Sequence, residues 1–149
     1  MKHLNLVFSA LAAATLTVAA FTAPALTQYG AAAAEESMQA LHKGTWTKKS
    51  HKASGEWSIY TEDGKTYVKL SSDFRTRNAP DLKIFLSPQA ASDANGRNAT
   101  DGAVLISPLS SNAGEQVYEI PASVNLADYQ SILIHCERFS KLWSAADLA

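Results

Sequence analysis

The chain has 149 residues, of which 46% are hydrophobic and 18% charged, and its formal net charge is -1. This length suits one globular domain. Because basic residues are not in excess, nucleic acid is not expected as a partner. The chain has one cysteine, which excludes an intramolecular disulfide, so stability has to come from packing.

The first 25 residues have the pattern of an export signal. Lys2 precedes an apolar run over residues 4–21, and an A-x-A site ends at Ala25. We predict cleavage after Ala25, which leaves no membrane span and places the mature chain in the periplasm or outside the cell. The alternative is an uncleaved anchor, which Pro24 disfavours because it breaks the apolar run.

Residues 26–43 follow this signal and are rich in alanine and glutamate. They are expected to form a short helix or a loose linker. The character of the chain changes at residue 44, and we predict a β domain over residues 44–149. Its clearest element is a hairpin, in which strands over residues 57–61 and 66–70 flank the turn dipeptide Asp63-Gly64.

Four more β-type runs follow the hairpin. In "DLKIFLS" the residues Leu82, Ile84 and Leu86 alternate with Lys83, as in a half-buried strand. The runs "AVLISPL", "EQVYEIP" and "SILIHCERF" complete the series. Six or more short strands without a long helical period predict an all-β fold, an antiparallel β-sandwich, with a β-barrel as the alternative.

A long polar loop separates two of these strands. Residues 92–102 contain several oxygen-bearing side chains, which are potential calcium ligands. Gly96 comes too early for an EF-hand loop, and no glutamate follows at the required spacing. We therefore favour a loop rich in turns and predict no metal site.

Cys136 lies in the last run, "SILIHCERF". Strand alternation places Ile132, Ile134 and Cys136 on one face, and Leu133, His135, Glu137 and Phe139 on the other. Three interpretations of the cysteine remain open. It is a small buried packing residue, a reactive thiol, or the ligand of a metal or haem. The strand pattern alone favours the packing residue.

Four blocks of the chain resemble the DM-thirteen domain family, also called the electron-transfer DM domain. They read "GTWTKKSHKASGEWSIY", "NAPDLKIFLSP", "GEQVYEIP" and "YQSILIHCERFSKLWSAADL". The matching residues are Gly44, His51, Gly55, Pro80, Asp81, Leu82, Leu86, Gly114, Tyr118, Pro121, Cys136, Phe139, Ala145 and Leu148. Their order along the chain, with a cysteine after a β run, carries the resemblance.

The resemblance implies electron transfer or oxidative modification at the cell surface, with Cys136 as a free thiol or as the ligand of a prosthetic group such as haem. A haem would be non-covalent, because the chain lacks a C-x-x-C-H motif. His51 matches a family histidine and is the candidate second ligand or proton partner of Cys136, with a backbone-bonded strand-end histidine as the alternative. His135 stands where the family pattern has an aromatic, and Arg138 or Lys141 would compensate negative charge on the sulfur.

Together these observations predict an extracytoplasmic redox domain that works through Cys136 with an unknown redox or envelope protein partner. No G-x-S-x-G elbow is present, and a stand-alone enzyme is not expected. The alternative is a binding or adhesion module of the envelope in which the cysteine only packs.

Overall fold

The computed structural model describes residues 38–148, so the expected export signal and most of the expected linker lie outside the described residues. The elements, in chain order, are β1 (Gln39–Thr45), β2 (Thr47–Lys48), β3 (Ala53–Ser54), β4 (Glu56–Glu62), β5 (Lys65–Leu70), β6 (Arg75–Thr76), β7 (Leu82–Ser87), β8 (Val104–Pro108), β9 (Gln116–Ile120), the 3-10 helix η1 (Leu126–Asp128), β10 (Ser131–Cys136), the 3-10 helix η2 (Glu137–Phe139) and β11 (Lys141–Asp147).

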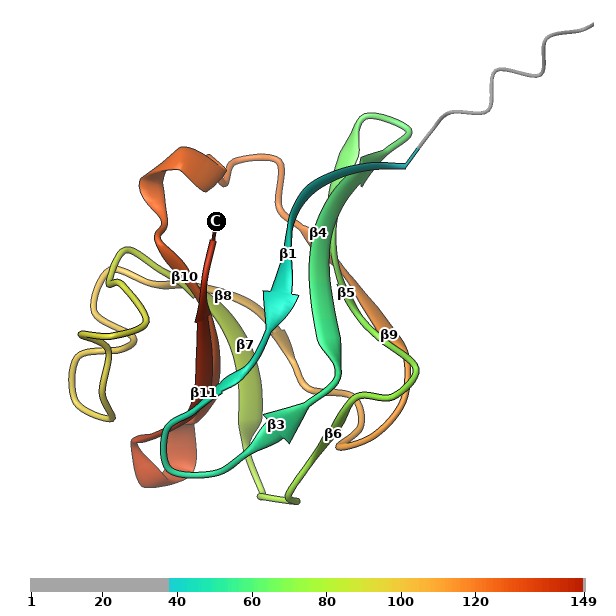
Figure 1. The fold of residues 1–149 in the computed structure, drawn as a ribbon. Helices are drawn as coiled ribbons and strands as arrows, with labels where there is room; N and C mark the ends of the chain where they lie inside the picture. The colour runs from blue at the N-terminus through green and yellow to red at the C-terminus, as the bar shows by residue number, and fades with distance from the viewer. Residues whose placement is uncertain (1–37, 149) are drawn as a thin grey trace, which may run out of the picture. The chain divides into compact units, whose positions relative to one another are not determined.

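The strands form two main antiparallel sheets. The first has the order β1-β4-β5-β9, and the second has the order β2-β11-β10-β7-β8 (Figure 1). The short strands β3 and β6 pair separately. No sheet of the described residues closes on itself, and the two main sheets share one core, so the predicted β-sandwich is confirmed and the barrel is not formed.

The predicted hairpin is formed by β4 and β5. Asp63 and Gly64 have φ angles of 51° and 73°, and the paired residues on either side of them are Glu62 and Lys65. Positive φ at both central residues matches the right-handed twist of the flanking strands, which is why this dipeptide marks a hairpin in a sequence.

Apolar side chains at alternate strand positions fill the space between the main sheets. Trp57 and Ile59 come from β4, Ile84 from β7, and Ile132 and Ile134 from β10, and all are at most 1% exposed. The two-residue period of a strand directs these side chains to one face. The sandwich core therefore follows from the alternation seen in the sequence.

A second apolar cluster covers the outer face of the second sheet. Phe85, Leu133 and Leu142 lie there, together with three small side chains from the loop over residues 88–103: Ala91, Ala94 and Ala99. The loop consists mostly of turns, as expected. Because it covers this face, β10 is buried on both sides and all six of its residues are buried.

Three expectations about the elements were wrong. Residues 39–43, expected in the linker, belong to β1, an edge strand with a largely exposed, polar pattern that is defined by its pairing with β4. The strand containing Cys136 ends at that residue, because residues 137–139 turn into η2. Finally, the last expected strand was the one containing Cys136, but a further strand, β11, follows it and pairs with β10 along its length.

Within residues 38–148, no helix has both the length and the apolar character that crossing a membrane requires.

Candidate redox site at Cys136

Cys136 is the last residue of β10 and lies in the core between the sheets. Its side chain is 0% exposed and belongs to the same apolar cluster as Ile132 and Ile134. On the neighbouring strands its register partners are Leu82 of β7 and Lys141 of β11. The predicted orientation toward the isoleucine face is therefore confirmed.

The chain reaches the surface immediately after Cys136. The residues of η2 are exposed, and Phe139 retains 56% of its accessible surface. Ser140 then takes a left-handed conformation, with φ of 47°, before β11 begins. The sulfur is thus buried, yet it is one residue away from an exposed corner of the second sheet.

Ionic and backbone contacts hold this corner. The Glu137 backbone N–H donates to the Asp81 carbonyl oxygen at 3.1 Å. The Lys83 ammonium pairs with the Asp81 carboxylate at 3.3 Å and with the Glu137 carboxylate. Its hydrogen bond to Glu137 is the main reason why the pKa of Lys83 is raised. These contacts connect the start of η2 to the start of β7.

The arrangement around the sulfur does not fit a haem. Cys136 lines none of four cavities at the surface of the described β domain, and its side chain is 0% exposed. A cavity of about 330 Å³ is lined by Asp81 and by Leu82, which is the register partner of Cys136. Cys136 itself does not line this cavity. A bound macrocycle needs a slot that opens onto its ligand atom, so haem ligation requires a different arrangement of the core.

His51 lies in the bend between β2 and β3, three residues after β2 ends, and not at the strand end that was expected. Its ring stacks on Trp143, with 3.6 Å between ring centroids, and its Nδ1 lies 3.1 Å from the Ser50 hydroxyl. Its carbonyl oxygen accepts a hydrogen bond from the Ser144 hydroxyl at 2.8 Å. None of the hydrogen bonds or ring contacts within residues 38–148 joins His51 to Cys136.

Positive charge surrounds His51. The pKa of this histidine is lowered, first because its ring loses hydration. Three nearby cations lower the pKa further, and they are Arg77, Lys141 and Lys48. Since each of these cations repels a proton on the ring, the neutral form of His51 is favoured.

His135 lies on the outer face of the second sheet, opposite Cys136, as predicted. Its side chain is 3% exposed, and the ring meets Phe85 edge-on with 6.1 Å between centroids. Neither ring nitrogen has a hydrogen-bond partner among residues 38–148. Burial lowers the pKa of His135, while the nearby backbone of Gly96 and the Glu137 carboxylate act in the opposite direction. Because His135 and Cys136 point to opposite faces of the sheet, they cannot bind one metal ion together.

The two expected compensating cations are exposed near the corner. Arg138 lies in η2, and Lys141 is the register partner of Cys136 at the start of β11. Within residues 38–148, no group of three or more histidine, cysteine, aspartate or glutamate side chains is arranged to hold a metal ion. In the polar loop, the Asn95 and Asn98 side-chain oxygens instead accept hydrogen bonds from the loop's own backbone.

Comparison with known proteins identifies the family of this chain. Residues 45–148 match the family model described as electron transfer DM13. No curated protein and no solved structure matches the chain significantly. The match covers nearly all of the described β-sandwich, including Cys136 and His51, and indicates a redox-related role. The chain therefore belongs to the electron transfer DM13 family.

Proposed function

We propose that the protein is an extracytoplasmic redox domain in which the Cys136 thiol is the group that changes oxidation state. The redox-related role of its family supports this function. The observation that carries it is the position of the only cysteine, buried at the end of β10 and followed at once by the exposed η2 corner. The sulfur is thus protected, and one short segment separates it from solvent.

Local opening of this corner would bring the sulfur to a partner without unfolding the sandwich. Short surface segments open at lower free energy than core strands do. With a peroxide as the oxidant, the thiol loses two electrons, a sulfur–oxygen bond replaces the peroxide oxygen–oxygen bond, and water leaves, which yields a sulfenic acid. A thiol of the partner then condenses with the sulfenic acid to a mixed disulfide, and water leaves. A second thiol of the partner attacks the partner's sulfur in this disulfide and releases Cys136 as the thiol.

His51 is the proposed acceptor of the thiol proton in the open corner. Its lowered pKa favours the neutral imidazole, and the neutral form is the one that acts as a general base. Lys141 or Arg138 would then balance the negative thiolate. Haem is left out of this mechanism, because no described cavity gives it access to the sulfur.

Thiol chemistry in the folded protein tests the proposal. The exported protein is treated with dilute hydrogen peroxide, the sulfenic acid is trapped with dimedone, and Cys136→Ala serves as the blank. We expect trapping in native buffer at a rate that low urea concentrations leave unchanged, and slower trapping in His51→Gln. Trapping that begins only in the unfolding transition would contradict a redox role of the thiol.

The haem alternative has its own measurement. The exported protein and Cys136→Ala are titrated with haem, and the absorption spectra are compared. The packed core predicts no Soret band that depends on Cys136. A band that the substitution removes would show that the core opens to form a haem site and would replace the thiol mechanism.

A binding or adhesion module is the second candidate function. The complete burial of Cys136 beside isoleucines favours it, since unpaired cysteines usually serve as small core residues. A thiol that stays inert in every folded condition would select this function.

The extracytoplasmic location depends on the predicted signal. Mass spectrometry of the protein recovered outside the cytoplasm should give the mass of residues 26–149. An intact chain of 149 residues in the membrane fraction would instead support the anchor.

A further inference from the structure

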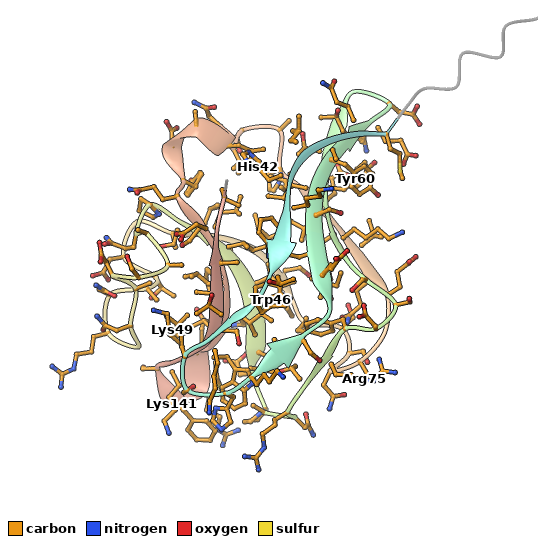
Figure 2. All side chains as sticks on the ribbon, viewed as in Figure 1. His42, Trp46, Lys49, Tyr60, Arg75 and Lys141 are labelled. Atoms are coloured by element: carbon orange, nitrogen blue, oxygen red, sulfur yellow. The ribbon has the colours of Figure 1, made fainter. Side chains whose placement is uncertain are left out.

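Four cations gather beside the stacked rings of His51 and Trp143, and we call them the basic surface. They come from segments far apart in the sequence, and they are Lys48, Lys49, Arg77 and Lys141. Three of them act electrostatically on His51. Lys49 and Lys141 line one cavity and lie on the same side of the molecule (Figure 2).

The basic surface lacks the acidic partners that other cations of this domain have. Lys65, Lys69 and Lys83 each form an ion pair with one or two carboxylates. Within residues 38–148, no ion pair involves any of the four cations of the basic surface. Since the formal net charge of the whole chain is -1, this local excess of positive charge is a feature of the tertiary structure.

The hydrogen bonds of the β2–β3 turn fix this surface on β11. The backbone N–H groups of Lys49 and His51 donate to the Trp143 carbonyl oxygen at 3.2 and 3.1 Å, and the Ser50 N–H donates to the Leu142 carbonyl oxygen at 3.1 Å. The cations of this turn are therefore held on a rigid edge.

The basic surface lies at the end of the second sheet that holds Cys136. Lys141 belongs to it and is the register partner of Cys136. The cavity between Lys49 and Lys141 has a volume of about 420 Å³ and is also lined by Ala94, Gly96 and Leu142. Ser50 and Asn95 complete the lining, and the Lys49 ammonium donates to the Ser92 carbonyl oxygen at 3.4 Å. Two ammonium groups beside this largely apolar wall suit a carboxylate side chain.

We infer that the basic surface is the docking face for an acidic protein, the redox partner of this domain. The inference rests on the proposed redox function and adds the chemistry of the partner. Complementary charge speeds encounter and orients the two proteins, and redox complexes use small, transient interfaces. An anionic membrane is the competing partner, but stable membrane binding usually combines basic residues with an inserted apolar group. Phe139 is the only large exposed apolar residue in the segment that leads to Lys141.

Binding of poly-L-glutamate to the exported protein tests this docking face. The test variant carries Lys48→Gln, Lys49→Gln and Lys141→Gln. A matched control carries Lys43→Gln, Lys65→Gln and Lys69→Gln, which remove the same charge elsewhere. We expect the test variant to bind about tenfold more weakly at low salt, and the control less than about twofold more weakly. Binding should also weaken at about 0.15 M salt, where the Debye length is about 8 Å.

Two other results would overturn the inference. Equal weakening in both variants would show that only net charge matters, and absence of binding would show that the surface does not recognise acidic chains. Vesicles of phosphatidylglycerol are the second probe. Binding to these vesicles that depends on the basic surface, without binding to poly-L-glutamate, would assign the surface to a membrane.

The failure of this inference is distinguishable from failure of the proposed function. Dimedone trapping is measured on Lys49→Gln alone, because Lys48 and Lys141 both act on His51. This substitution should leave the trapping rate unchanged. An inert thiol with binding that depends on the basic surface would sink the redox function while the acidic docking face stands. A reactive thiol without such binding would support the redox function and overturn the acidic docking face.

Discussion

The burial of the Cys136 side chain predicts how substitutions at this position change the stability of the fold. Its side chain is 0% exposed among apolar neighbours. Replacing it by serine buries a hydroxyl and should lower the free energy of unfolding by about 1–3 kcal/mol. Replacing it by alanine leaves only a small cavity and should cost about 1 kcal/mol. Urea unfolding followed by tryptophan fluorescence measures both changes, and a serine variant as stable as the parent would mean that the site is hydrated.

Gly55 is constrained by both its conformation and its surroundings. Its φ is 86°, and a Cβ there would lie 2.7 Å from the Phe74 Cα. Gly55→Ala should therefore cost more than about 1 kcal/mol of unfolding free energy. Gly64→Ala is the matched control, because Gly64 has a similar φ of 73° but open space around it. Equal losses of stability in thermal unfolding would show that close packing against Phe74 does not matter.

The loop over residues 88–103 confines His135 and gives the fold a pH dependence. Burial lowers the pKa of His135 from 6.5 in the folded state, so the unfolded chain binds the proton more readily. The contribution of neutral His135 to the free energy of unfolding is therefore complete above pH 6.5. This contribution is lost as the pH falls through the lowered pKa of the folded state. We expect His135→Phe to reduce this loss in urea unfolding measured between about pH 7 and 5.

The control for this prediction is His51→Gln. The pKa of His51 is also lowered, but its ring is partly exposed, and solvent screens the interaction. This variant should keep most of the pH dependence. If it removes more of the slope than His135→Phe does, the loop does not bury an ionisable group.

The whole molecule should unfold as one unit, because both main sheets share a single core. Ile134→Ala should lower the unfolding free energy by about 2–5 kcal/mol. Val117→Ala, at a position 47% exposed, should change it by less than about 0.5 kcal/mol. The transitions seen by tryptophan fluorescence and by far-ultraviolet circular dichroism should coincide. Separate transitions would show that the sheets are independently stable.

The outer layer of the second sheet was beyond prediction from the sequence. The loop over residues 88–103 is polar overall, and its three buried alanines do not distinguish it from an exposed loop. Both nitrogens of His135 are buried without a hydrogen-bond partner, and Gly96 of this loop lies near the ring. The edge strand β1 was missed for a similar reason, since its identity depends on hydrogen bonds to β4 and not on a buried face.

The sequence by itself determined the β class of the domain, the β4–β5 hairpin and the face of β10 that carries Cys136. Each depends on the two-residue period of strands or on the φ preferences of a two-residue turn, and both are local properties. Only the tertiary structure decided that no described cavity reaches the sulfur, that His51 stacks on Trp143, and that four unpaired cations form one surface. These features join residues distant in the chain, and their positions follow from sheet pairing and packing.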